Sequence, residues 1–246
     1  MDLSLILLIA VTFLLAGLVK GVIGLGLPTV SLALLTATLG LPQAMALLLV
    51  PSFATNLWQA LSGGNGKSIL RRHWPFFVMA TVTIWLGALA LTRLDGALLS
   101  GLLGLLLVVY SVVNLAGVRI AIPASRQVWL GPAFGAANGV LTGMTGSFVV
   151  PGVMYLQAIG LSREVLVQAM GILFTASTVA LGLALGGNGL LDAQLGLTSA
   201  IALVPAIGGM LVGQAIRDRL SETIFRRVLF LSLLAMGIHL MLGLAA

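Results

Sequence analysis

Long apolar runs separated by short polar stretches fill most of the chain. Ten such segments stand out, at residues 3–19, 28–39, 43–62, 75–92, 97–117, 128–146, 151–160, 164–186, 194–216 and 226–244. Within residues 3–19 and 97–115 nearly every position is apolar, without the alternation that a membrane β-strand requires. Runs of this kind are typical of transmembrane helices. The pattern therefore predicts an all-α fold with many membrane-crossing segments.

Two of the ten segments are too short to cross a bilayer alone. A helix over residues 28–39 would be about 18 Å long and one over residues 151–160 about 15 Å long, at 1.5 Å per residue, whereas the hydrocarbon core is about 30 Å thick. Both segments begin at a proline, Pro28 or Pro151, and both follow a glycine-rich stretch. Proline suits the first turn of a helix. We expect two counterpart half-helices, which either span the membrane with other segments or re-enter it.

Composition supports a membrane protein and excludes other classes. Of the 246 residues, 60% are hydrophobic and only 7% are charged, whereas about 25% of the residues in a soluble domain are charged. So few charges cannot cover the surface of a soluble fold of this size. Disorder is excluded by the high hydrophobicity. The N-terminal residues lack the basic region of a cleavable signal peptide, so the first helix is expected to stay.

An internal repeat relates the two halves of the chain. The pattern Gly-x₃-Gly-x₂-Gly followed by proline occurs twice, at Gly17, Gly21, Gly24 and Pro28, and at Gly139, Gly143, Gly146 and Pro151. In each copy the proline is followed by a short apolar segment and a turn. We therefore predict two transmembrane repeats, residues 1–120 and residues 121–246.

The distribution of charge predicts that the second repeat is inverted. Basic residues concentrate at 63–73, at 118–127 (including Arg119) and at 217–227, and cytoplasmic loops carry such an excess. In the first half the basic loop follows the third segment, and in the second half it follows the fourth. Five segments antiparallel to five place all three basic loops inside and both termini outside. This is the charge signature of an inverted-repeat membrane protein.

Ionisable residues at mid-membrane positions would suggest a proton relay or an intramembrane enzyme. The carboxylates instead lie at segment ends or in loops, at Asp2, Asp95, Glu164, Asp192, Asp218 and Glu222. Cysteine is absent, so no thiolate metal site or thiol nucleophile exists. His239 lies in the last helix, where a hydrogen-bonded packing role is the favoured interpretation. We expect no enzyme activity, no metal site, no cofactor and no nucleic-acid partner.

The glycine-rich breaks, placed at residues 20–27 and 142–150, are the strongest functional signal. Irregular backbone in a bilayer survives where it lines a cavity or is buried in protein, and free N–H groups at a helix N-terminus attract anions. Two half-helices from opposite repeats would direct such ends at one midplane site. The alternative is close helix packing through small-x₃-small glycines. The candidate substrate-binding residues are Lys20, Gly24, Gly26, Thr29, Asn56, Thr142, Thr145, Gly146, Ser147 and Gly152.

Several of these side chains have a second interpretation. Lys20 would attract an anion, or it would anchor the helix end by extending towards the interface. Hydroxyl groups in membrane helices often bond only to their own backbone. Gln59, Gln168 and Thr175 on the third segment of each half are further polar neighbours of the breaks. Gly101 and Gly104 pack helices either within the chain or between copies in a homo-oligomer.

The first break (residues 17–28), its second copy ending at Pro151 and the stretch at residues 51–56 resemble the TauE/SafE family of sulfite exporters. The resemblance extends over nearly the whole chain, because the family is this duplicated unit. It implies a permease of the cell membrane that transports small sulfur-containing anions, such as sulfite or organosulfonates. The chain departs from the family pattern at Lys20, Val22, Ile23 and Leu25, where that pattern is richer in glycine. A further departure is Ala176, at the position corresponding to Asn56.

Three hypotheses about function follow. The first is a secondary transporter of a small anion that works by alternating access between the two halves. The second is a channel-like or cation- or metal-conducting permease, against which the shortage of acidic ligands argues. The third is a membrane scaffold, for which the short loops leave no docking domain. With no carboxylate at mid-membrane, proton coupling would depend on the protonation of the substrate itself.

Overall fold

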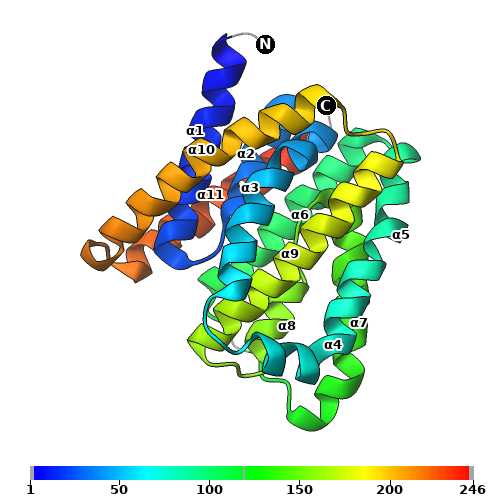
Figure 1. The fold of residues 1–246 in the computed structure, drawn as a ribbon, viewed down its shortest axis with the longest axis vertical. Helices are drawn as coiled ribbons and strands as arrows, with labels where there is room; N and C mark the ends of the chain where they lie inside the picture. Colours follow the sequence, from blue (N-terminus) through cyan, green and yellow to red (C-terminus); the bar gives the residue numbers. More distant parts are fainter. Residues whose placement is uncertain (1–2, 119, 244–246) are drawn as a thin grey trace. The chain divides into compact units, whose positions relative to one another are not determined.

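The computed structural model describes residues 3–118 and 120–243 (Figure 1). Within these residues the fold is all-helical, with 85% of them in helices and no strand. The prediction of an all-α fold is therefore confirmed. Asp2 and Arg119 lie outside the described residues, so their predicted positions are not addressed.

The helices follow the predicted apolar segments closely. Their bounds are α1 (Leu3–Ile23), α2 (Leu27–Leu39), α3 (Leu41–Leu61), α4 (Gly66–Val82), α5 (Ile84–Ala88), η1 (Leu89–Thr92), α6 (Gly96–Leu115), α7 (Ala124–Thr145), α8 (Gly152–Ala158), α9 (Arg163–Gly187), α10 (Ala193–Ile216), η2 (Arg217–Arg219) and α11 (Glu222–Leu242). The two predicted half-helices are α2, with 13 residues, and α8, with 7 residues. Both are largely buried in the protein.

Some predicted boundaries were wrong. Helix α1 continues through Lys20 to Ile23, and α7 continues through Thr142 to Thr145. The breaks between the helices therefore begin later than predicted, at Gly24 and Gly146. The predicted basic loop at 63–73 is also mostly helical, because α4 begins at Gly66.

In the part of the chain that is described, seven helical stretches are long and apolar enough to cross a membrane. They are Leu3–Ile23, Leu41–Leu61, Gly66–Thr92, Gly96–Leu115, Arg163–Gly187, Ala193–Arg219 and Glu222–Leu242. Large apolar side chains line the outside of these helices. On α10, Leu197, Ile201 and Val204 share one helical face and are 64%, 61% and 73% exposed. Such a face suits lipid, and the protein is a multi-pass membrane protein.

The chain divides into two compact units. Unit 1 contains Met1–Pro51, Asp95–Gly117 and Leu190–Ala246, and unit 2 contains Ser52–Leu94 and Val118–Gly189. Each unit thus combines segments from both predicted repeats. The units describe how the chain packs and do not test the predicted duplication. The division into repeats at 1–120 and 121–246, and the inverted orientation of the second repeat, therefore stay predictions.

In unit 1, glycines bring α1 and α10 into backbone contact, and Figure 1 shows the two helices side by side. A Cβ atom on Gly17 would overlap the carbonyl oxygen of Ala206, and one on Gly209 would overlap that of Leu14. Gly104 of α6 packs in the same way against Gly237 of α11. Small residues that let helix backbones meet are the usual device of membrane interfaces. Gly104 therefore serves packing within the chain.

In unit 2, the second copy of the glycine pattern has the same function. A Cβ atom on Gly139 of α7 would overlap the hydroxyl of Thr83, and one on Gly143 would overlap the carbonyl oxygen of Ile84 at the start of α5. The first two glycines of each repeat motif are thus helix-packing positions. The third glycine of each motif has a different role, described next.

Candidate substrate site

In unit 1 the first break joins α1 to α2 through three residues, 24–26. Gly24 and Gly26 have φ angles of 85° and 111°, in the left-handed region where only glycine is unstrained. The N–H of Gly24 donates to the carbonyl of Lys20 at 2.7 Å and closes α1. Helix α2 then begins at Leu27, and no side chain among the described residues caps it. Its first turn therefore presents the partial positive charge of a helix N-terminus.

Lys20 and Thr29 are the polar side chains predicted at this break. Lys20 lies in the last turn of α1 and is only 5% exposed, and Thr29 lies in the first turn of α2 and is 6% exposed. An anchor that extends towards the interface would keep its ammonium group in contact with solvent. The burial of Lys20 instead favours the alternative, an amine held inside the protein next to the break. Buried ionisable residues in membrane helices are functional candidates.

In unit 2 the second break is held together by the hydroxyl groups of α7. Gly146 has a φ angle of 72° and donates its N–H to the carbonyl of Thr142 at 2.7 Å. The hydroxyl of Thr142 donates to the carbonyl of Ser147 at 2.8 Å. The N–H of Ser147 donates to the hydroxyl of Thr145 at 3.2 Å, and that hydroxyl donates to Leu141 at 2.7 Å. Both backbone groups of Ser147 are therefore fixed by threonines.

Three predicted site residues at this break have hydrogen-bond partners within the chain, and their roles in substrate binding stay predictions. The N–H of Gly152, expected to be free for an anion, donates to Oδ1 of Asn138 at 2.9 Å. The hydroxyls of Thr142 and Thr145 are directed at their own backbone segment, which is the alternative that hydroxyls in membrane helices often follow. Ser147 remains a candidate. The residue is 4% exposed, and its hydroxyl has no hydrogen-bond partner in the described part of the chain.

Asn56, the remaining predicted residue, belongs to a polar ladder in unit 2. Its Nδ2 donates to the hydroxyl of Ser52 at 2.9 Å, and that hydroxyl lies 3.3 Å from the hydroxyl of Thr178 on α9. Asn56 and Ser52 are both fully buried. The ladder joins α3 to α9, which indicates a structural role for the Asn56 amide.

The two glutamines at the ends of the same helix pair form reciprocal bonds. Gln59 donates to the carbonyl of Val167 at 2.7 Å, and Gln168 donates to the carbonyl of Ala60 at 2.8 Å. Gln168 also accepts from the N–H of Asn65 at 2.8 Å. Thr175, their predicted neighbour, donates to Gly171 of its own helix. These side chains therefore hold helices together.

Comparison with protein families decides the identity. The family model described as Sulfite exporter TauE/SafE matches residues 9–240, nearly the whole chain. The chain belongs to the TauE/SafE family. The resemblance seen in the glycine breaks is thereby confirmed. TauE/SafE proteins are membrane transporters, which places this chain among transporters rather than enzymes. No curated protein and no solved structure matches it.

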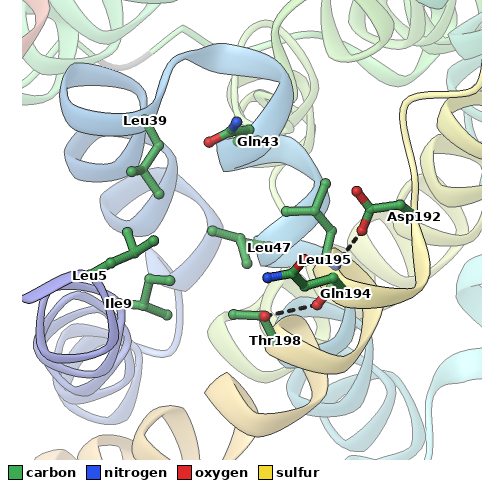
Figure 2. Close-up of a pocket in the computed structure, with 9 residues that line it drawn as sticks. All are labelled: Leu5, Ile9, Leu39, Gln43, Leu47, Asp192, Gln194, Leu195 and Thr198. Atoms are coloured by element: carbon green, nitrogen blue, oxygen red, sulfur yellow. Dashed lines mark hydrogen bonds between the residues drawn. The ribbon is translucent and has the colours of Figure 1, made fainter. Parts of the chain in front are cut away.

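The TauE/SafE chain also has a cavity of about 230 Å³ in unit 1, shown in Figure 2. Helices α1, α2, α3 and α10 contribute its lining, which is Leu5, Ile9, Leu39, Gln43, Leu47, Asp192, Gln194, Leu195 and Thr198. It contains none of the predicted site residues. The Asp192 carboxylate at its edge accepts from the N–H of Leu195 at 2.6 Å and caps α10. A carboxylate repels anions, so this cavity does not suit the expected substrate.

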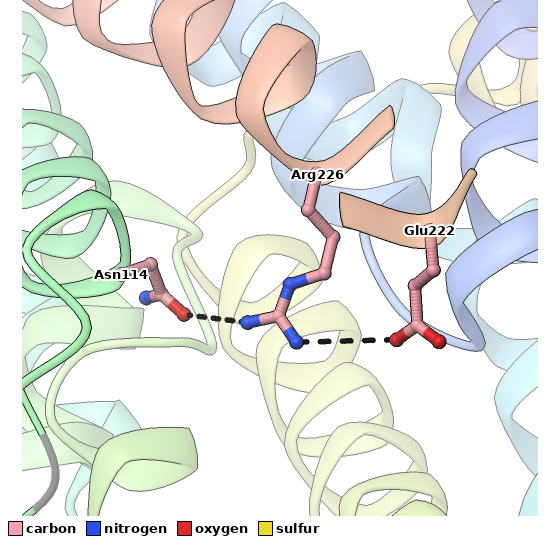
Figure 3. A network of polar contacts seen from close by, with 3 residues as sticks. All are labelled: Asn114, Glu222 and Arg226. Atoms are coloured by element: carbon pink, nitrogen blue, oxygen red, sulfur yellow. Dashed lines mark hydrogen bonds and ion pairs between the residues drawn. The ribbon is translucent and has the colours of Figure 1, made fainter. Parts of the chain in front are cut away.

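Arg226 forms a second polar cluster in unit 1, which Figure 3 shows from close by. It donates to Oδ1 of Asn114 at 3.5 Å and lies 4.0 Å from Glu222. The Arg226 and Glu222 side chains are 43% and 51% exposed, and an exposed pair of this kind contributes little stability. The cluster connects α6 to α11 near the basic end of α11.

Across residues 3–118 and 120–243, no group of three or more His, Cys, Asp or Glu residues could hold a metal ion.

Asn138 is the residue of this TauE/SafE chain that the sequence interpretation missed. It is fully buried on α7, one turn before Thr142. A signal for it existed, because an amide within the small and apolar stretch 135–140 is a costly residue in a membrane helix. The predicted second break began at residue 142, one helical turn after Asn138.

Proposed function

We propose that this protein is a secondary transporter of small sulfur-containing anions, such as sulfite or organosulfonates, in the cell membrane. Transport would occur by alternating access. The description of its family as sulfite exporters supports the substrate class. The observation that carries the proposal is Lys20, a buried lysine one helical turn before a glycine break.

The chemistry of the first break suits an anion. Lys20 supplies an amine that is positively charged when protonated, and the first turn of α2 at Thr29 supplies partial positive charge from backbone N–H groups. The left-handed turn at Gly24 and Gly26 lets the backbone change direction without side chains in the way. We assign these four residues to anion binding.

The second break offers neutral donors in a rigid frame. The hydroxyl of Ser147 is the group we assign to the substrate. Thr142, Thr145 and the turn at Gly146 hold the backbone of Ser147 in place, so they act as positioning residues. Neutral donors suit an oxyanion, whose oxygens accept several hydrogen bonds at once.

The test is sulfite flux into proteoliposomes that contain the purified wild-type protein, with chloride as a comparison anion. We expect saturable sulfite flux that is lost in Lys20→Glu and reduced at least about tenfold in Lys20→Met, since charge-assisted hydrogen bonds are the strong ones. Lys67→Met is the matched control, because Lys67 is the other lysine of the chain and is exposed on α4. It should transport like the wild type.

Three results would contradict the proposal. A wild-type protein that moves neither sulfite nor sulfonates has no anion-transport function of this kind. Conductance that never saturates would instead favour a channel-like permease. If flux is saturable but Lys20→Glu leaves it unchanged, Lys20 does not bind the anion.

A further inference from the structure

Asn138 occupies the face of α7 that holds the second break together. Asn138, Thr142 and Thr145 follow one another at spacings of four and three residues, so they lie on the same side of the helix. All three are fully buried. Thr142 and Thr145 bond to Ser147, and Asn138 bonds to Gly152 at the far end of the same segment. The three side chains thus hold the break between them.

The orientation of the Asn138 amide is fixed by its bond to Gly152. Oδ1 accepts the Gly152 N–H at 2.9 Å, and the flipped amide would bring two donors face to face. Nδ2 must therefore point elsewhere, with both of its hydrogens. Within residues 3–118 and 120–243, this buried Nδ2 has no hydrogen-bond partner.

Asn138 differs from the serine and threonine hydroxyls inside helices that lack a partner among the described residues. Thr36, Ser111 and Ser177 are such groups, and a rotation about χ1 lets each hydroxyl bond the carbonyl four residues earlier. Asn138 has no such choice, because rotating its amide breaks the bond to Gly152. Ser147 is comparable to Asn138, because it lies outside any helix and its own backbone groups are already bonded.

We propose that Asn138 is a specificity-determining residue of the transporter, whose Nδ2 donates a hydrogen bond to an oxygen of the transported oxyanion. The inference rests on the proposed function. A buried N–H group without an acceptor is costly, and an anionic oxygen is a strong acceptor. Asn138 and Ser147 then recognise the oxygens of the substrate, so an oxyanion is preferred to a halide or a cation.

The deciding variant is Asn138→Asp, which has the same shape. Its carboxylate still accepts the Gly152 N–H, and that bond favours the charged form, whereas burial opposes the charge. KM is therefore compared over a range of pH that reaches values at which the carboxyl group is ionised, because a protonated carboxyl would still offer one O–H donor. The donor is replaced by a negative acceptor that faces the substrate. Asn188→Asp is the matched control, because Asn188 at the end of α9 bonds only the carbonyl of Ala184 in the described chain.

The measurement is the KM for sulfite in proteoliposomes, together with the thermal stability of each variant in detergent. We expect Asn138→Asp to raise KM by roughly ten- to a hundredfold, with little change in its melting temperature, and Asn188→Asp to resemble the wild type. An unchanged KM in Asn138→Asp overturns the inference while leaving the proposed function intact. A wild-type protein that transports no anion overturns the proposed function, and the inference with it.

A second measurement decides the matter if Asn138→Asp fails to fold. The chain has five asparagines, so the wild-type protein labelled with ¹⁵N at asparagine side chains gives few NH₂ signals. Addition of sulfite should shift the signal of Asn138, and addition of chloride should not. A signal that responds to neither anion shows that Nδ2 bonds water or nothing, and it overturns the inference.

Discussion

Ser199 of α10 compensates for the proline inside α3, and its loss is predicted to destabilise unit 1. Pro51 has no N–H, so the carbonyl of Leu47, four residues earlier, lacks its usual helical donor. The hydroxyl of Ser199 donates to this carbonyl at 2.8 Å. The same hydroxyl accepts the N–H of Val50 at 3.1 Å. One side chain therefore satisfies a donor and an acceptor beside the proline.

The expected cost of Ser199→Ala follows from burial. Ser199 is 1% exposed, so neither backbone group gains easy access to water when the hydroxyl is removed. A buried polar group left unpaired costs about 1–3 kcal/mol in soluble proteins. Side-chain hydrogen bonds in membrane proteins contribute about 0.6 kcal/mol on average, because the unfolded state in the membrane also finds partners. For two bonds we expect a loss of about 1–3 kcal/mol in the free energy of unfolding.

The assay is reversible unfolding in mixed micelles with increasing amounts of denaturing detergent, combined with a double-mutant cycle. In Pro51→Ala the new N–H can donate to the carbonyl of Leu47, so Ser199→Ala should cost about 1 kcal/mol less in that background. Ser232→Ala is the control, because its exposed hydroxyl bonds only the carbonyl of Val228 among the described residues. If Ser199→Ala is as stable as the wild type, or costs the same in both backgrounds, the reasoning is refuted.

Three glycine substitutions give further predictions. Gly152→Ala places a Cβ atom 2.5 Å from Oδ1 of Asn138, so the amide must move; we expect about 1–3 kcal/mol of destabilisation and loss of sulfite flux, measured by unfolding and in proteoliposomes. Gly209→Ala should separate α10 from the carbonyl of Leu14 and destabilise by a similar amount. Gly208→Ala, with no described atom within 4 Å of its new Cβ, should be neutral or slightly stabilising in the same unfolding assay.

The sequence predicted most helices to within a few residues, as for 164–186 against the observed Arg163–Gly187. The reason is physical: lipid offers no hydrogen-bond partners, so a long apolar run has little choice but to be helical. The position of each break was predicted less well. Gly21 and Gly143 were expected to unwind the chain, but they lie inside helices and pack against Met210 and Ile84. Which glycine packs and which one turns depends on a neighbouring helix that the local sequence does not reveal.

The site residues show the same limit. Ser147 and Lys20 were predicted as site residues from their chemistry and their distance from the glycines, and their substrate roles stay predictions. The hydrogen bond from the Thr142 hydroxyl to the carbonyl of Ser147 could not be predicted, because it depends on how residues 146–151 fold back on α7. Asn138 was missed for a related reason. Its bond to Gly152 joins residues 14 positions apart, with the break between them.

The two breaks begin with the same backbone turn but differ in side-chain chemistry. In each copy the third glycine of the motif donates its N–H to the residue four positions earlier, from Gly24 to Lys20 and from Gly146 to Thr142, at 2.7 Å in both cases. Thr142 uses its side chain to close its own break. Lys20 at the equivalent position instead places a buried amine there. The two copies therefore share a turn at a glycine with positive φ, which only glycine adopts without strain, while the side chain one helical turn earlier differs in its chemistry.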